Sequence, residues 1–214
     1  MKKTAILAGA TGLVGGHLLQ RLLNSPHYDR VVALVRRPLD VTHPHLQQVL
    51  FDFDHPDADA VRGDDLFCAL GTTLRKAGSK AAQYRVDVEY PLSLGRIARA
   101  QGVRQYLLVS SVGANAHARL FYLRMKGELE EQLAALGLET FISVRPSTLL
   151  GERAEFRLGE RVGVAIDRLF RPFIPARYRG IHADQVAAAL VALANAGLRG
   201  VHIVESERLT GFPR

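Results

Sequence analysis

A tyrosine and a lysine one helical turn apart follow a pair of serines in the middle of the chain. Ser110 and Ser111 end an apolar run, Tyr122 stands eleven residues after Ser111, and Lys126 stands four residues later. Residues four apart share one face of a helix, so the phenol and the ammonium would point the same way. Because an ammonium beside a phenol favours the phenolate, these residues predict proton transfer to or from an oxygen atom.

Each of these side chains has a chemical role in such a reaction. Tyr122 would give its proton to a carbonyl oxygen, and Ser111 would hydrogen-bond that oxygen as charge develops on it. Lys126 would also hold the ribose hydroxyls of a cofactor. Ser110 takes the role of Ser111 if the strand ends one residue earlier. A tyrosine and a lysine at this spacing also occur by chance on helix surfaces, so the motif gains weight only from its context.

A glycine motif near the N-terminus supplies that context. In AILAGATGLVGGHLLQRLL, glycines at positions 9, 12 and 15 follow an apolar run and open an amphipathic segment. The first permits a tight turn, the second lets a pyrophosphate approach the backbone, and the third lets the helix pack on the strand. A glycine-rich turn without a ligand is the alternative. The predicted cofactor cradle consists of Gly9, Ala10, Thr11, Gly12, Leu13, Val14 and Gly15.

The end of the second expected strand indicates which dinucleotide would bind. NAD-specific proteins usually carry an acid there for the ribose 2′-hydroxyl, whereas this chain has Arg36 and Arg37. A guanidinium can bind a 2′-phosphate through two hydrogen bonds and stack on the adenine. We therefore expect NADP(H) to be preferred over NAD(H), with a solvated arginine pair as the alternative.

Further cofactor contacts are expected where the next two strands end. Asp52, followed by Phe53, could accept a hydrogen bond from the adenine amino group, although an ordinary loop aspartate fits as well. Leu70, Gly71 and Thr72 follow the fourth strand. Ligands bind at the carboxyl edge of open α/β sheets, and a glycine there lets the backbone lie against the cofactor.

The elements that must position these residues alternate between strand-like apolar runs and segments of helical period. This alternation predicts a single doubly wound α/β Rossmann domain over residues 1–214, with a mostly parallel seven-stranded sheet and helices on both faces. The expected strands are 4–8, 31–35, 48–51, 66–70, 105–109, 139–144 and 200–204. The expected helices are 13–24, 81–101, 119–136, 159–170 and 184–196, with a loop or very short helix at 51–65 and a frayed tail over 206–214.

Composition limits the class of protein. The net charge of +7 is dispersed and is not interleaved with stacking aromatics, so no nucleic-acid partner is expected. No apolar run approaches the roughly 18 residues that span a bilayer, so no membrane partner is expected. The single cysteine, Cys68, favours a reduced compartment, and we expect the cytoplasm. His43, His45 and His55 share a polar loop without metal-ligand spacing, so no metal is expected.

Together these motifs resemble the short-chain dehydrogenase/reductase superfamily, and more narrowly its atypical branch. The stretch from Phe67 to Gln132, with CALGTT, YRVDVEYPLSLGRIARAQGV, LLVSSVGA and FYLRMKGELE, is similar to the TIP30/CC3 group of oxidoreductase-like proteins. The resemblance implies that Asp87 faces the cofactor and that Pro146, in an Arg-Pro motif, lies along the nicotinamide. This chain departs from the classical members in one respect, because no asparagine can be assigned to the position that relays protons in them.

The C-terminal third is too short for a separate substrate domain, so the substrate pocket is expected mainly from residues 149–181. Apolar residues that line this pocket or belong to the core are Phe156, Leu169, Phe170, Phe173 and Ile174. The expected function is NADP(H)-dependent chemistry on the carbonyl/alcohol pair of a small apolar substrate. The alternative is an NADPH-binding regulatory or sensor protein without significant turnover. Either a monomer or a homodimer is expected.

Overall fold

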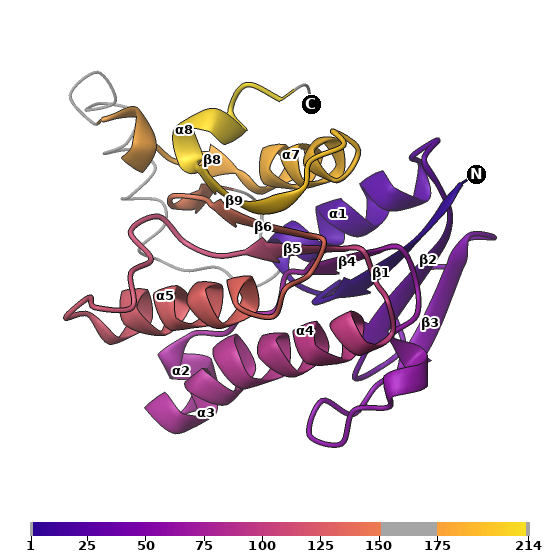
Figure 1. Ribbon diagram of the computed structural model, residues 1–214, viewed down its shortest axis with the longest axis horizontal. Coiled ribbons are helices and arrows are strands. Elements are labelled where there is room, and N and C mark those ends of the chain that lie inside the picture. Colours follow the sequence, from indigo (N-terminus) through magenta and orange to yellow (C-terminus); the bar gives the residue numbers. More distant parts are fainter. Residues whose placement is uncertain (1, 151–174, 213–214) are drawn as a thin grey trace.

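A computed structural model of the chain describes residues 2–150 and 175–212. Within them, seven parallel strands form one sheet in the order β3-β2-β1-β4-β5-β6-β9 (Figure 1). The strands are β1 Lys3–Ala8, β2 Tyr28–Val35, β3 Leu46–Leu50, β4 Asp65–Cys68, β5 Gln105–Val109, β6 Thr140–Arg145 and β9 Gly200–Glu205. A separate parallel pair joins β7 Leu149–Leu150 to β8 Ile181–His182. The predicted seven-stranded Rossmann sheet is confirmed.

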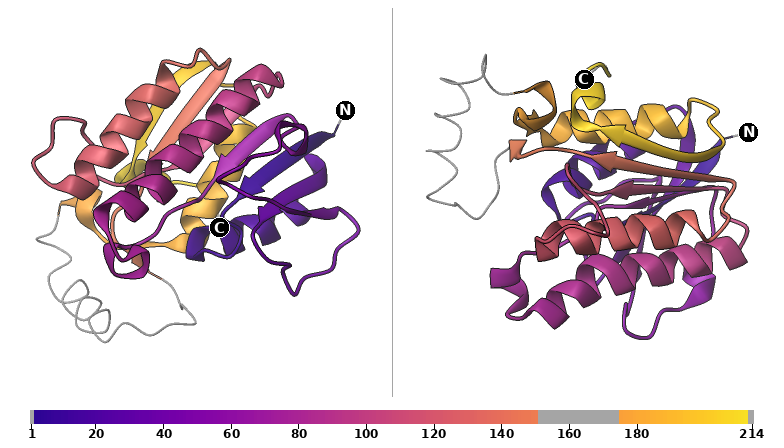
Figure 2. Two further views of the ribbon diagram at one scale, coloured as in Figure 1. Left: turned by 90° about the horizontal axis from the view of Figure 1, so that it is seen from below. Right: turned by 60° about the vertical axis from the view of Figure 1, so that its left-hand side comes forward.

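Helices cover both faces of this sheet (Figure 2). On one face lie α1 Leu13–Leu23 and α7 Ala183–Ala194, and on the other lie α4 Tyr90–Ala100 and α5 Phe121–Ala134. The shorter elements are η1 Ala58–Ala60, α2 Leu74–Ala77, α3 Lys80–Tyr84, η2 Arg85–Glu89, η3 Ala176–Tyr178 and α8 Ser206–Leu209. The very short helix allowed for 51–65 is η1. The helix expected at 159–170 lies outside the described residues.

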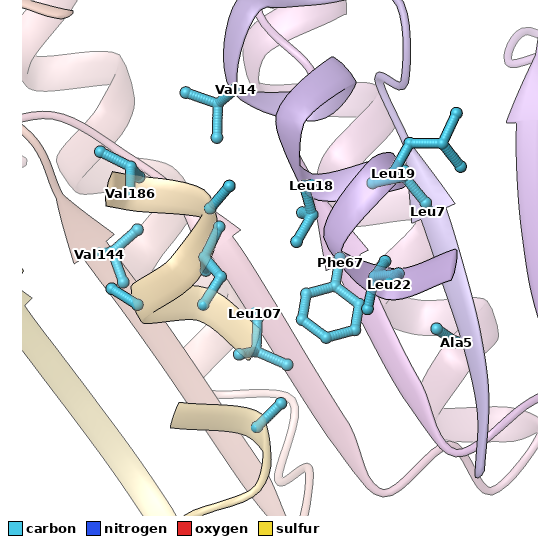
Figure 3. Packing of buried hydrophobic residues seen from close by; sticks show 14 of the residues in the cluster. Ala5, Leu7, Val14, Leu18, Leu19, Leu22, Phe67, Leu107, Val144 and Val186 are labelled. Atoms are coloured by element: carbon cyan, nitrogen blue, oxygen red, sulfur yellow. The ribbon is translucent and has the colours of Figure 1, made fainter. Parts of the chain in front are cut away.

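The alternation of side chains along each strand builds a separate core under each helical layer. In β1, Leu7 faces the layer of α1 and α7, whereas Ile6 and Ala8 face the layer of α4 and α5. Figure 3 shows Leu18 and Leu22 of α1 among the side chains packed in the first layer. Both leucines are fully buried, which stabilises the fold by about 2 kcal/mol each. This packing holds α1 against β1 and so fixes the turn between them.

The single helix expected over 81–101 is wrong at one point, because a π-helical turn interrupts it at η2. Pro91 has no N–H and cannot donate to the carbonyl of Asp87, four residues before it. The N–H of Tyr90 instead bonds the carbonyl of Arg85, five residues back. The bulge buries Asp87 in the molecule. Such π-bulges are rare and frequently occur at functional sites.

The frayed tail expected over 206–214 is wrong for its first half. Ser206–Leu209 form α8, and Leu209 is fully buried in the layer of α1 and α7. The hydroxyl of Ser206 accepts a hydrogen bond of 3.1 Å from the N–H of Ser147. The tail was expected to fray because its composition is largely polar. The burial of its one leucine, Leu209, holds Ser206–Leu209 against the domain.

Some expectations concern the chain as a whole. Among the described helices, none is long and apolar enough to cross a membrane. The described ranges also contain no cluster of three or more His, Cys, Asp or Glu side chains that could hold a metal ion. The division of the chain into one domain over 1–214 stays a prediction, because residues 151–174 are not described.

Candidate functional site

The turn after β1 brings three backbone segments into close contact. Gly9 has a φ of +92°, and a Cβ on it would lie 2.6 Å from the carbonyl carbon of Ala69, just after β4. A Cβ on Gly15 would overlap the carbonyl oxygen of Gly9, whereas one on Gly12 would lie 3.3 Å from that oxygen. Gly9 and Gly15 are therefore needed for β1, β4 and α1 to meet.

The other residues of the predicted cradle surround this turn. Thr11 and Gly12 are exposed, Leu13 is half-buried, and Ala10 and Val14 pack in the core. Within the described residues no side chain caps the first turn of α1, so its N–H groups are available to an anion. An open backbone turn at a helix N-terminus fits the pyrophosphate of a dinucleotide.

The residues after β2 and β3 differ in how accessible they are. Arg36 and Arg37 are exposed, and neither forms an ion pair within the described part of the chain. Asp52 is also exposed, but one of its carboxylate oxygens accepts a hydrogen bond of 2.9 Å from the N–H of Asp54. Phe53 packs its ring in the core, so any contact of Phe53 with a cofactor would come from its backbone.

A buried ion pair lies under the loop that follows β4. Nζ of Lys126 on α5 is 2.9 Å from Oδ1 of Asp87 in η2, and the two side chains are 3% and 1% exposed. Oδ2 of Asp87 accepts a hydrogen bond of 2.8 Å from the N–H of Thr72. A Cβ on Gly71 would lie 3.4 Å from Oδ1 of Asp87, and Leu70 packs on the core of this layer. Five predicted site residues are thus gathered at one place.

The charge of Lys126 is maintained in this setting. Burial opposes the charged form, but Asp87 and Tyr122 favour it, and the pKa of the ammonium is raised above its ordinary value. Nζ of Lys126 lies 6.0 Å from the centroid of the Tyr122 ring, and Tyr122 is 41% exposed. The ammonium therefore lies near both a buried carboxylate and an exposed phenol.

The two serines after β5 occupy different environments. Ser110 is buried, and its hydroxyl has no hydrogen-bond partner among the described residues. Ser111 is half-buried, and its hydroxyl donates a long hydrogen bond of 3.4 Å to the carbonyl of Val112. Pro146 is buried, and its backbone carbonyl accepts a hydrogen bond of 3.0 Å from the N–H of Val112. An unpartnered buried hydroxyl at this edge fits a bound cofactor that would supply its partner.

Sequence reasoning missed Gly127, the neighbour of Lys126. A Cβ on Gly127 would overlap the backbone of Asn115 and Ala116, in the segment between β5 and α5. The N–H of Asn115 also bonds the carbonyl of Leu123 at 3.0 Å. This segment therefore rests directly on α5. The signal that could have revealed this contact is the position of Gly127 inside a helical pattern, because a glycine there often allows another segment to approach the helix closely.

The expected apolar lining of the substrate pocket falls in the part of the chain that is not described. That part contains Phe156, Leu169, Phe170, Phe173 and Ile174. The pocket expected over 149–181 therefore stays a prediction.

Comparison with known sequences identifies the family of this chain. A family model described as NAD(P)H-binding matches residues 9–196. A relative from Eremothecium gossypii, named Protein FMP52, mitochondrial, is 32% identical over 219 residues, which cover 96% of this chain and 95% of that protein. The protein of the same name from Aspergillus clavatus is 35% identical over 210 residues, covering 91% and 87% of the two chains.

Solved structures share the fold at low sequence identity. MoeE5 in complex with UDP-glucose and NAD has a TM-score of 0.73 and 20% identity, covering 96% of this chain and 79% of that one. A UDP-glucose 4-epimerase from Thermotoga maritima with UDP-glucose has a TM-score of 0.71 and 16% identity, covering 99% and 84%. At these identities the likeness shows the fold alone.

The expected cytoplasmic location is contradicted, because the curated relatives are named mitochondrial proteins. The expectation rested on a single buried cysteine, Cys68, without a disulfide partner. A reduced thiol excludes oxidising compartments only, so it does not separate the cytoplasm from other reducing compartments. The narrower likeness to the TIP30/CC3 group stays a prediction.

Proposed function

This chain belongs to the NAD(P)H-binding family, and from that premise we propose that it is an NADP(H)-dependent oxidoreductase acting on the carbonyl/alcohol pair of a small apolar substrate. Its Rossmann fold fits the atypical branch of the short-chain dehydrogenase/reductase superfamily. The observation that carries the proposal is the buried Lys126–Asp87 pair next to Tyr122, at the sheet edge that also carries the glycine turn.

Three side chains would perform the proton chemistry. The hydroxyl of Tyr122 donates its proton to the substrate oxygen, and the hydroxyl of Ser111 donates a hydrogen bond to the same atom. Lys126, which Asp87 keeps charged, stabilises the phenolate that Tyr122 becomes. In the opposite direction Tyr122 takes the proton of an alcohol.

The chain's own groups also suit the cofactor, which when bound supplies or accepts a hydride. The turn from Gly9 to Gly15 would hold the pyrophosphate, and Lys126 the ribose hydroxyls of the nicotinamide half. Ser110 and Pro146 would border the nicotinamide. Arg36, with Arg37, would bind a 2′-phosphate, and we therefore propose a preference for NADP(H) over NAD(H).

The test is NADPH consumption with a panel of small aldehydes and ketones, comparing wild type with Tyr122→Phe. We expect wild type to turn over at least one carbonyl and the variant to be slower by about 100- to 10,000-fold, with NADPH binding unchanged. Tyr84→Phe, which removes another phenol, one whose hydroxyl donates a hydrogen bond of 3.1 Å to Glu128, is the matched control and should keep wild-type activity. Equal rates in Tyr122→Phe and wild type would remove Tyr122 from the mechanism.

The second candidate is an NADPH-binding sensor without significant turnover. Its specific support is that Asp87 already neutralises Lys126, and that Tyr122 is 41% exposed rather than enclosed. NADPH binding in wild type without consumption on any carbonyl would favour this function.

A further inference from the structure

Helix α5 carries a second buried charge on the face that bears Tyr122 and Lys126. Glu130 follows Lys126 by four residues, as Lys126 follows Tyr122, so the three side chains lie along one stripe. Glu130 is 4% exposed. A carboxylate buried to this degree must be fully partnered, because an isolated buried charge destabilises the fold strongly.

The partners of Glu130 come from β6. The hydroxyl of Ser143 donates a hydrogen bond of 2.7 Å to Oε1 of Glu130. The guanidinium of Arg145 donates to both oxygens, from Nε at 3.1 and 3.2 Å and from a terminal nitrogen at 2.5 Å. This hydrogen bonding to Glu130 outweighs burial and raises the pKa of Arg145. The interaction is therefore a bidentate ion pair between α5 and the sheet.

Arg145 is itself held from the other side. It lies opposite Glu205 in the register of β6 and β9, and its second terminal nitrogen donates a hydrogen bond of 3.0 Å to Oε1 of Glu205. Glu205 is also 3.6 Å from the guanidinium of Arg177 in η3. Arg145 is thus paired with β9 as well as with α5, so a shift of α5 alone would strain or break one of the two pairs.

A bidentate pair defines position more strictly than the leucine packing around it. Met125, Leu129 and Leu133 of α5 are buried in the core, where apolar attraction has no preferred direction. A buried ion pair often adds little net stability compared with apolar residues, so its value lies in fixing one geometry. The planar guanidinium donates two parallel hydrogen bonds to the carboxylate, which restricts the orientation of both groups.

We propose that Glu130 is a positioning residue that, by docking on Arg145, sets the rotation and height of α5 and thereby places Tyr122 and Lys126 at the sheet edge. At about 1.5 Å per residue, Glu130 lies about 6 Å along the axis from Lys126 and about 12 Å from Tyr122. With Lys126–Asp87 as the first anchor, Glu130–Arg145 is the second. The assignment rests on the proposed function, in which Tyr122 is the acid.

The test uses protein labelled with 3-fluorotyrosine, in which the Tyr122 signal is assigned by its loss in Tyr122→Phe. The variant is Glu130→Gln, which keeps the shape but gives up the charge. The matched control is Glu139→Gln, which breaks an exposed pair with Arg199 at 3.6 Å. The fluorine spectrum is recorded without cofactor, and the Kd for NADPH and kcat are measured on the same samples.

We expect Glu130→Gln to move the Tyr122 resonance and to lower kcat by about 100-fold, as a misplacement of about 1 Å does. The Kd for NADPH should change much less, because Lys126 keeps its pair with Asp87. Glu139→Gln should change none of these quantities. An unmoved Tyr122 resonance with wild-type kcat in folded Glu130→Gln would overturn the proposal. If Glu130→Gln does not fold, Arg145→Lys, which keeps the charge and loses the bidentate geometry, decides by the same two readouts.

The fluorine readout separates this proposal from the proposed function. If wild type turns over no carbonyl, the proposed function fails, yet a Tyr122 resonance that moves in Glu130→Gln still supports the positioning role. If wild type is active and the resonance stays in place, only the positioning role fails.

Discussion

Asp87 and Lys126 form the pair on which the site depends. Both are almost completely buried, and each supplies the other's main charge compensation. Asp87 also fixes the loop after β4 through the N–H of Thr72. One carboxylate therefore connects the helix that carries the proposed acid with the loop that would face the cofactor.

Replacing Asp87 by Asn should leave the ammonium of Lys126 buried without a counter-charge. We expect Asp87→Asn to lower the free energy of unfolding by about 3 kcal/mol and the pKa of Lys126 to fall, because the main interaction that opposes the effect of burial is then lost. Urea unfolding measures the loss. The double variant Asp87→Asn/Lys126→Met should recover part of it, and a single variant as stable as wild type would contradict the account.

At the same scale, Arg36 is the residue to which we assign the proposed preference for NADP(H). Arg36→Ala should raise the Kd for NADPH by about 10- to 100-fold, since a hydrogen bond to a charged group contributes about 1.5–3 kcal/mol, and should leave the Kd for NADH nearly unchanged. Fluorescence titration with both nucleotides checks this, with Arg30→Ala as a control from the opposite end of β2. Equal losses for both nucleotides would contradict a 2′-phosphate contact.

At the scale of elements, α5 is held by contacts on several sides. The segment between β5 and α5 lies against Gly127. On another side Glu130 is held by Arg145 of β6, which is itself paired with Glu205 of β9. The geometry of the site therefore depends on how closely one helix is packed.

Gly127→Ala should separate α5 from the segment before it. The added Cβ would overlap backbone atoms of Asn115 and Ala116, which cannot rotate away, so we expect a loss of about 1–3 kcal/mol in the free energy of unfolding and a fall in turnover. Gly16→Ala is the helical control, because its Cβ would lie 3.7 Å from the carbonyl oxygen of Ala10, an ordinary contact. Thermal unfolding of Gly127→Ala at the wild-type temperature would show that the contact is unimportant.

Sequence patterns predicted the strands and long helices because burial repeats with a period that is visible locally. The glycine turn and the Ser-Tyr-Lys spacing could also be recognised, because each is a set of residue types at fixed spacing within a short stretch of the chain. The pairs Asp87–Lys126 and Glu130–Arg145 join residues on different elements, and nothing local in a single sequence marks such partners. The π-turn at η2 and the burial of Leu209 likewise depend on tertiary packing.

At the scale of the whole molecule, burial raises the pKa of several side chains. It raises the pKa of the Cys68 thiol and of the Tyr28 and Tyr106 phenols above their ordinary values. Each group then binds its proton more tightly in the folded than in the unfolded chain. The stability they contribute is fully present below the unfolded pKa and is lost as pH rises toward the folded one.

Stability should therefore decline with rising pH from about 8.5, where an unfolded thiol begins to ionise. Cys68→Ala removes the first group to act and should flatten the decline by at most about 1.4 kcal/mol per pH unit between about pH 8.5 and 10. Urea midpoints of both proteins across this range provide the measurement. Parallel curves would show that Cys68 does not contribute.

The central claim is that this chain moves a hydride between NADPH and a carbonyl, with Tyr122 supplying the proton. Its most direct test is mass spectrometry of the alcohol formed with NADPH in which both hydrogens at C4 of the nicotinamide are replaced by deuterium. The account predicts that wild type delivers one deuterium to the former carbonyl carbon and that Tyr122→Phe forms almost no labelled alcohol. Tight NADPH binding by wild type with no deuterium in any product would contradict it.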